Sequence, residues 1–147
     1  MANFNADNAA ATAAIPQTRI KTNKQHGSIR YFESTFDAAV SGAPQIADTI
    51  TWGDLPVGAR VLAHLSQLSY GTGTASSTAT VGDAGSANRH LAAQAINSAG
   101  ATTLTSNAAG VASYEVTEAT KTLTSTIAGA AVGASQKISL RVAYVLD

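Results

Sequence analysis

One stretch of ten residues, Val81 to His90 (VGDAGSANRH), gathers most of the residue types in this chain that could do chemistry. It holds a carboxylate, two glycines, a hydroxyl, a guanidinium and an imidazole. Phosphate-binding loops, metal sites and acid–base pairs all use such groups, and each requires its own spacing.

The spacing in this stretch does not meet those requirements. A P-loop has a Lys directly after its second glycine, and none follows Gly82 or Gly85. The chain has no Cys, and its three His residues are isolated, so no set of metal ligands is evident. We therefore expect no metal and no cofactor.

Catalytic arrangements are equally unsupported elsewhere in the chain. The Gly-x-Ser-x-Gly turn of the α/β-hydrolases is absent. Glu115 and Glu118 are three positions apart and would face opposite sides of a strand, whereas Glu33 and Asp37 would share one face of a solvated strand. We therefore expect no enzymatic activity.

The stretch is more typical of a junction between two elements. Its glycines suit a tight reversal after a strand that ends at Val81. Ser86 can cap a helix over residues 86–100, whose apolar stripe would include Leu91 and Ile96 and which would end before Gly100. We expect Asp83 and Arg89 to pair within the fold or across a subunit contact, with a small anion near Arg89 as the alternative. The structural loop comprises Gly82, Asp83, Gly85, Ser86 and Arg89.

The segments around this junction alternate with a period of two, as β-strands do. The clearest is residues 137–147 (KISLRVAYVLD), where one face carries Ile138, Leu140, Val142, Tyr144 and Leu146. Further strands are predicted over residues 28–40, 46–52, 59–70, 72–81 and 101–106, and a hairpin is predicted to join 110–117 to 121–129. A short helix is the alternative for 59–70, and 72–81 is expected near an edge or a subunit contact.

Several short strands with frequent turn residues predict an all-β fold, and we expect a jelly-roll-like antiparallel sandwich with one short helix and an extended N-terminal arm. The arm is residues 1–27, which have few large apolar residues and no clear period, and the sandwich domain is residues 28–147.

The arm concentrates positive charge. Four of the nine Lys and Arg residues lie within residues 19–30, where acidic residues are absent. We expect the arm to contact an acidic surface of a partner or of a neighbouring copy, with a solvated tail as the alternative. The expected contact residues are Phe4, Arg19, Lys21, Lys24, His26 and Arg30.

Charged residues make up only 12% of the chain, about half of the ~25% usual in soluble domains, and the formal net charge is zero. That balance argues against specific nucleic-acid binding, and the arm lacks interleaved aromatic residues for base stacking. Low charge favours a surface that is covered by assembly. No apolar run approaches the ~20 residues of a membrane span, and we expect neither a membrane partner nor a secretory signal.

Residues 50–147 resemble a type of small structural protein found in tailed bacteriophages. The matching segments are ITWGDLPVGARVL (50–62), TATVGDAGSANRHLAA (78–93) and ISLRVAYVLD (138–147). The resemblance implies a capsid decoration protein, often trimeric, that is made in the host cytoplasm, binds the major capsid protein on the virion surface and stabilises the head. The alternative is a tail, fibre or head-tip protein that binds another virion protein or a host glycan, the latter through exposed aromatic residues such as Trp52 or Tyr114.

Overall fold

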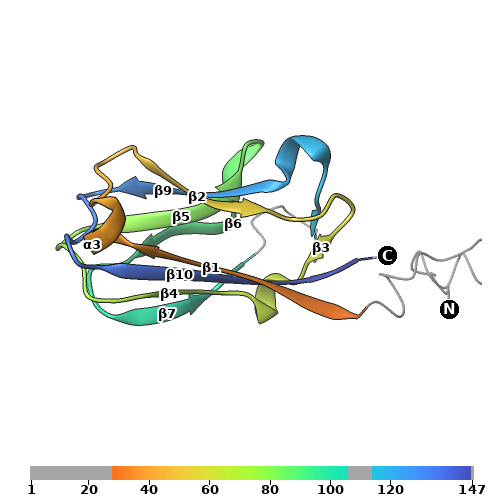
Figure 1. Cartoon of the computed structure of the whole chain (residues 1–147), viewed down its shortest axis with the longest axis horizontal. Coiled ribbons are helices and arrows are strands. Elements are labelled where there is room, and N and C mark those ends of the chain that lie inside the picture. Colours follow the sequence, from red (N-terminus) through yellow and green to blue (C-terminus); the bar gives the residue numbers. More distant parts are fainter. Residues whose placement is uncertain (1–27, 106–113, 147) are drawn as a thin grey trace, which may run out of the picture.

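Two antiparallel β-sheets pack face to face in the computed structural model, which describes residues 28–105 and 114–146 (Figure 1). The first sheet contains β1 (Ile29–Asp37), β10 (Lys137–Val145), β4 (Gln67–Tyr70) and β7 (Gly100–Thr103), with the short strands β3 (Arg60–Val61) and β8 (Tyr114–Glu115) beside one end of β10. The second sheet has the order β2 (Thr49–Asp54), β9 (Thr122–Ala128), β5 (Thr78–Asp83) and β6 (Ser86–Ala95).

Chain connections repeatedly cross between these two sheets. Along the chain, β1 lies in the first sheet, β2 in the second, β3 and β4 in the first, β5 and β6 in the second, β7 and β8 in the first, β9 in the second and β10 in the first. This alternation is a jelly-roll arrangement. The predicted all-β, jelly-roll-like sandwich is therefore confirmed.

Strand β10 lies inside the first sheet, between β1 on one side and β4 and β3 on the other. Its register with β1 runs without a shift from Ile29 opposite Val145 to Asp37 opposite Lys137. The side chains of its predicted apolar face are fully buried at residues 138, 140 and 142 and partly buried at 144 and 146. The clearest predicted strand is thus confirmed as one wall of the core.

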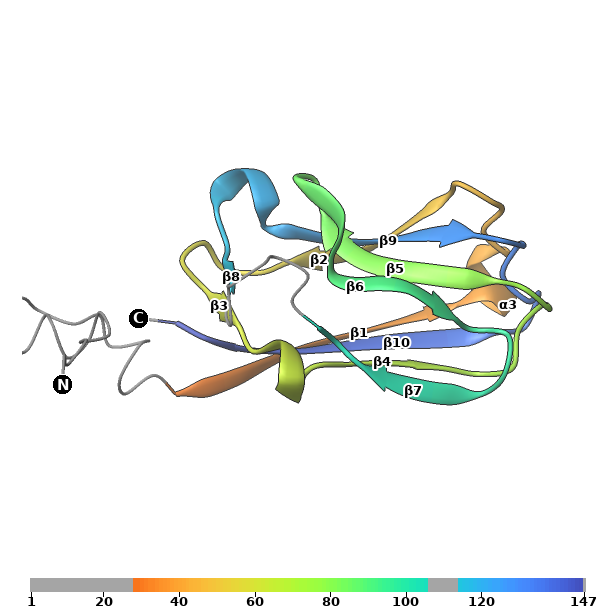
Figure 2. The same cartoon turned by 180° about the vertical axis from the view of Figure 1, so that it is seen from behind.

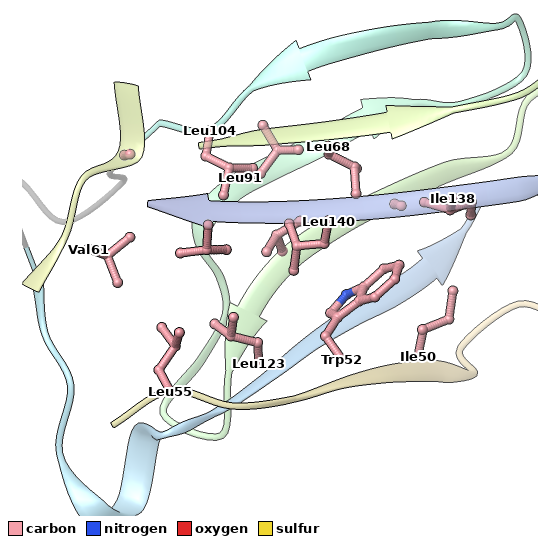
Figure 3. Close-up of a cluster of buried hydrophobic side chains, with 14 of the residues drawn as sticks. Ile50, Trp52, Leu55, Val61, Leu68, Leu91, Leu104, Leu123, Ile138 and Leu140 are labelled. Atoms are coloured by element: carbon pink, nitrogen blue, oxygen red, sulfur yellow. The ribbon is translucent and has the colours of Figure 1, made fainter. Parts of the chain in front are cut away.

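The core fills the space between the sheets, and Figure 3 shows side chains from both meeting there. Trp52 of β2 and Leu123 of β9 come from the second sheet, and Leu140 of β10 faces them from the first. Burial of each such side chain stabilises the fold by about 1.5–3 kcal/mol. Trp52 also donates a hydrogen bond from Nε1 to Ser125 Oγ at 2.8 Å, so its polar atom is satisfied inside the core.

The predicted helix over residues 86–100 is wrong, because residues 86–95 form β6, residues 96–99 form a loop and β7 begins at Gly100. The Ala-rich composition favours a helix locally, but the pairing of β6 with β5 satisfies the same backbone groups in a sheet. The short helix is instead α3 (Ala38–Ser41), where Asp37 Oδ1 accepts a hydrogen bond from the Ala39 N–H at 3.0 Å. It ends the predicted strand over 28–40 at Asp37.

Other predicted strands are shorter or paired differently. Segment 59–70 divides into β3, the 3₁₀ turn η1 (Ala63–Leu65) and β4, and segment 72–81 is a strand only from Thr78, in β5. Strand β5 lies between β9 and β6, so its expected edge position is wrong.

The predicted hairpin between 110–117 and 121–129 is also wrong. Strand β8 pairs with β3 in the first sheet, whereas β9 pairs with β2 and β5 in the second, and the 3₁₀ turn η2 (Glu118–Thr120) crosses between the sheets. Strand β2 begins at Thr49 rather than at 46, because Ala47 has a positive φ of 72°.

No helix among the described residues is long and apolar enough to cross a membrane. The predicted arm, residues 1–27, lies outside the described residues, so the division into arm and domain stays a prediction.

Candidate functional site

The stretch from Val81 to His90 is a β-hairpin, with its turn at residues 84 and 85 between β5 and β6. Asp83 pairs with Ser86 across this turn. The predicted tight reversal is therefore present, but it leads into a strand and not into a helix. Figure 2 shows the hairpin tip beside the blue segment that carries η2, at the end of the sandwich opposite α3.

Asp83 holds the turn together. Its Oδ1 accepts hydrogen bonds from the Gly85 N–H at 2.8 Å and the Ser86 N–H at 3.0 Å. Its Oδ2 accepts one from Arg89 Nε at 2.6 Å. Ser86 was expected to accept backbone hydrogen bonds with its side chain, but here the Asp83 carboxylate accepts them. The Asp83 side chain is completely buried.

Gly82 is required by a close approach of the two strands. The β5–β6 register shifts on both sides of Val81, and a Cβ atom at Gly82 would lie 2.1 Å from the carbonyl oxygen of Ser86. Because that neighbour is backbone, it cannot rotate away. The hairpin can form in this geometry only with glycine at position 82.

Arg89 joins the hairpin to β8. Its guanidinium lies over the Tyr114 ring at 4.1 Å from the centroid, while its Nε bonds Asp83. The hydrogen bond to Asp83 raises the pKa of Arg89. An arginine held between a carboxylate and an aromatic face is fixed in one geometry, because its planar group bonds and stacks at once.

His90 is buried behind this pair. Its ring packs edge-on against Tyr114, with centroids 6.1 Å apart, and its Nε2 lies 3.9 Å from Asp83 Oδ2. Burial lowers the pKa of His90 to about 4, more than the nearby Asp83 charge raises it. At neutral pH the ring is uncharged, so its contact with Asp83 is not an ion pair.

The cluster extends to η2 through hydroxyl groups. Tyr114 donates to Thr120 Oγ1 at 3.1 Å, and the Thr117 N–H donates to the same oxygen at 3.0 Å. The Thr117 and Thr120 side chains close a reciprocal capping box around η2. Asp83, Arg89, His90, Tyr114 and Thr120, which we call the hairpin cluster, therefore connect three separate segments of the chain.

The hairpin cluster is built to be rigid. Asp83 uses both carboxylate oxygens in hydrogen bonds with the protein and has no exposed surface from which to act on a ligand. Among the described residues, no three His, Asp or Glu side chains gather where they could hold a metal ion. The arrangement can lock a hairpin against its neighbours. That structural role of the loop residues remains our prediction.

A second polar hub, which the sequence did not indicate, lies in the loop before β10. Gln136 is buried and donates from Nε2 to the carbonyl oxygens of Gly71 at 2.8 Å and Ile96 at 2.7 Å. Its Oε1 accepts from the Gly133 N–H at 3.2 Å. Gln136 thus ties together loops from both sheets, and only its burial distinguishes it from an ordinary loop residue.

Near this hub, at the α3 end, an open groove of about 450 Å³ runs between the end of β1 and the loop that leads into β2. Phe36 and Thr49 are among the residues that line it. The Asp48 carboxylate at its edge accepts a hydrogen bond from the Gln45 N–H at 2.7 Å, which fixes the loop.

Of the predicted contact residues, the structure describes Arg30 alone, near the start of β1 and exposed. Phe4, Arg19, Lys21, Lys24 and His26 lie outside the described residues. The structure therefore does not test whether these six residues lie close together.

The outer face of β1 and β10 carries a row of cross-strand pairs. Lys137 Nζ lies 3.2 Å from Asp37 Oδ2, and Arg141 Nε lies 3.0 Å from Glu33 Oε1. The Arg141 guanidinium also covers the Tyr31 ring, at 4.1 Å from its centroid. Glu33 and Asp37, which the sequence placed on one solvated face, are thus ion-pairing residues on the sheet surface.

The aromatic residues considered for a glycan groove do not form one. Trp52 is 6% exposed and belongs to the core. Tyr114 is half-buried beneath Arg89. The expectation that these two side chains line an exposed groove is wrong.

No protein-family model matches the chain, and no curated protein matches its sequence. Among solved structures, a chain of the cyanophage Pam1 capsid asymmetric unit is 27% identical, with a TM-score of 0.67 over 90% of this chain and 96% of that chain. This chain resembles a phage structural protein. A chain in the capsid of Ralstonia phage GP4 shares the fold, at 19% identity and a TM-score of 0.66 over 82% of this chain and 86% of that one. The resemblance inferred from the sequence is confirmed.

Proposed function

We propose that this protein is a capsid decoration protein, which binds the assembled phage head and stabilises it. The observation that carries the proposal is the similarity to a chain of the cyanophage Pam1 capsid asymmetric unit, because it extends over nearly the full length of both chains. The similarity to the Pam1 capsid chain directly supports a structural role in the virion. The major capsid protein is the proposed partner, and the virion surface is the proposed location after synthesis in the host cytoplasm.

The mechanism would be linkage between binding and assembly. A protein that binds the assembled shell but not its dissociated subunits lowers the free energy of the shell, by about 2.7 kcal/mol per site at a free concentration 100 times Kd. A sandwich with a continuous core and the locked hairpin cluster suits this role, because a rigid clamp loses little conformational entropy on binding.

The basic arm supplies the proposed contact to the capsid or to a neighbouring copy. Arg30 marks the point where the chain passes from the arm into β1. With Phe4, Arg19, Lys21, Lys24 and His26, it would meet an acidic surface, and such charge mainly accelerates and orients association. The resemblance implies three copies in the assembly, and light scattering on the purified protein measures that number.

The test uses phage heads that lack this protein, mixed with the purified full chain and sedimented. We expect saturable binding and a higher temperature of head opening. The proposal would be contradicted if the protein bound neither empty heads nor expanded heads.

Replacement of Arg19, Lys21 and Lys24 by Gln tests the arm separately. The expected result is weaker binding with a smaller dependence on salt. The matched control replaces three cations of the sandwich, Lys121, Lys137 and Arg141, by Gln. Unchanged binding of the arm variant would remove the arm from the mechanism and leave the decoration role standing.

A further inference from the structure

The open groove beside α3, which we call the α3 groove, is bordered by the two most exposed large apolar side chains of the described residues. Val40 of α3 is 83% exposed, and Ile46 in the loop that leads into β2 is 60% exposed. Pro44 and Asp48 of the same loop line the groove. Exposed apolar side chains gathered around a groove are typical of an interaction site.

The loop that forms one side of the α3 groove is fixed by backbone hydrogen bonds to β9. The Ala47 N–H donates to the carbonyl oxygen of Ile127 at 2.8 Å, and the Ile127 N–H donates to that of Asp48 at 3.0 Å. A fixed loop loses little conformational entropy when a segment binds beside it. The groove is therefore formed before any partner binds.

Asp48 differs from every other carboxylate among the described residues, because no cationic side chain lies within ion-pair distance of it. The other six carboxylates each have a cationic partner: Glu33, Asp37, Asp54, Asp83, Glu115 and Glu118. The arm carries the complementary charge, since residues 1–27 contain Arg19, Lys21 and Lys24 but a single acidic residue. Charge complementarity of this kind orients the binding of a segment.

Residues 15–21 of the arm (IPQTRIK) combine the apolar and cationic side chains that the α3 groove would accept. Pro16 has a fixed φ and biases Ile15 toward an extended backbone, which suits binding along a groove. We propose that this segment binds the α3 groove of a neighbouring copy. Arg19 then pairs with the partner's Asp48, and Ile15 and Ile20 pack on the apolar border of the groove.

The course of β1 favours a neighbouring copy over the arm's own copy. Strand β1 begins at Ile29, at the end of the sandwich opposite α3, and ends at Asp37 beside α3 (Figure 1). Nine residues of strand span on the order of 30 Å, and the ten residues from Arg19 to Ile29 reach at most about 36 Å. Within one copy, Arg19 could therefore reach the groove only if the chain ran back along all of β1 almost fully extended.

An arm that leaves one end of the sandwich and a groove at the other end make a head-to-tail contact. Repetition of such a contact closes into a ring when the rotation between copies permits it. The inference rests on the proposed function in this respect, because the resemblance implies three copies. It goes further by naming the surfaces through which the three copies meet.

The first test is the mass of the full chain in solution during dilution, measured by light scattering, with the substitution Asp48→Asn. Asn keeps an oxygen for the Gln45 N–H and removes only the charge. Loss of one exposed ion pair should weaken each contact about threefold, and therefore the assembly of three copies about thirtyfold. The control is Glu118→Gln, which neutralises an exposed carboxylate of η2, at the opposite end of the sandwich. A monomeric unchanged chain, or equal effects of the two substitutions, would overturn the inference.

The second test locates the arm directly. The chain contains no Cys, so introduced cysteines report contacts without background. We expect a mixture of Gln17→Cys and Ser41→Cys proteins to form a disulfide-linked dimer under mild oxidation, because Ser41 lines the groove. The control mixture replaces Ser41→Cys by Ala93→Cys, an exposed position of β6 on the opposite edge of the second sheet from β2. Equal cross-linking of the two mixtures would overturn the inference.

A protein with both Gln17→Cys and Ser41→Cys distinguishes the two possible origins of the arm. Linked dimers and trimers are expected, whereas a monomer that loses its free thiols would place the arm on its own copy and overturn the inference. Neither result depends on heads. A chain that cross-links as expected but does not bind heads would contradict the proposed function and leave this inference standing.

Discussion

Arg89 donates a hydrogen bond to Asp83 across the β5–β6 hairpin at 2.6 Å, and its guanidinium stacks on Tyr114 of the opposite sheet. Asp83 is completely buried, whereas the side chain of Arg89 is 17% exposed. The pair therefore anchors the hairpin tip of one sheet on a strand of the other. We therefore expect disruption of the pair to destabilise the packing of this whole end of the sandwich.

Replacement of Asp83 by Ala removes the acceptor of two backbone N–H groups and the partner of Arg89. We expect a loss of about 2–4 kcal/mol in the free energy of unfolding, because a partly buried cation and two backbone donors lose their partner. Urea denaturation measures the loss. The control is Glu118→Gln, which removes the exposed ion pair with Lys121 and should change stability by less than about 1 kcal/mol. Equal effects of the two substitutions would contradict the assigned role of Asp83.

His90 should make stability depend on pH in the acid range. Its pKa is about 4 in the folded protein and 6.5 in the unfolded chain, so the unfolded chain binds the extra proton first. Stability is therefore complete above pH 6.5 and falls as the pH drops toward 4, by at most about 3 kcal/mol at 1.36 kcal/mol per unit.

The measurement is urea denaturation of the unchanged protein and of His90→Gln at pH 7 and pH 4.5. The variant should lose less stability between the two pH values, whatever its stability at pH 7. Parallel losses would show that His90 does not titrate in this way.

Gly82→Ala should damage the hairpin through a backbone clash. The added Cβ would meet the Ser86 carbonyl oxygen at 2.1 Å, so the strands must separate, at a cost of about 1–3 kcal/mol or more. Gly71→Ala is the matched control, because a Cβ atom at position 71 would lie 3.7 Å from the Lys137 carbonyl oxygen, an ordinary van der Waals contact. Thermal unfolding of both variants compares them directly, and a loss no larger at position 82 than at 71 would refute the close approach.

Gln136→Leu should destabilise the α3 end of the sandwich. The carbonyl oxygens of Gly71 and Ile96 lose their donor, and each unsatisfied buried acceptor costs about 1–3 kcal/mol. The neighbouring Ser135→Ala, at an exposed position, should change the unfolding free energy by less than about 0.5 kcal/mol. Gln136 would be an ordinary loop residue if both variants unfolded at the same urea concentration.

The hairpin cluster shows which features of the site could be predicted from the local sequence and which could not. The glycines and the charged pair around the turn are visible in the sequence, and a reversal there was predictable. The helix predicted after it was wrong, because Ala-rich residues 86–95 have no local feature that reveals a strand partner. Tyr114 and Thr120 were not predictable members of the cluster, since they approach Asp83 only through the packing of β8 and η2.

The amino-acid sequence determined the properties that depend on neighbours along the chain. The alternation of residues 137–142 indicated a strand with one buried face, because side chains of a strand point alternately to opposite sides. Frequent turn residues between short strands indicated a β-rich sandwich. Only the tertiary structure decided which strands pair and which charges are buried. Those features depend on contacts between segments that are distant in the sequence, such as β1 with β10 and β8 with β3. The periodicity of a segment predicts a strand but does not indicate with which other strand it pairs.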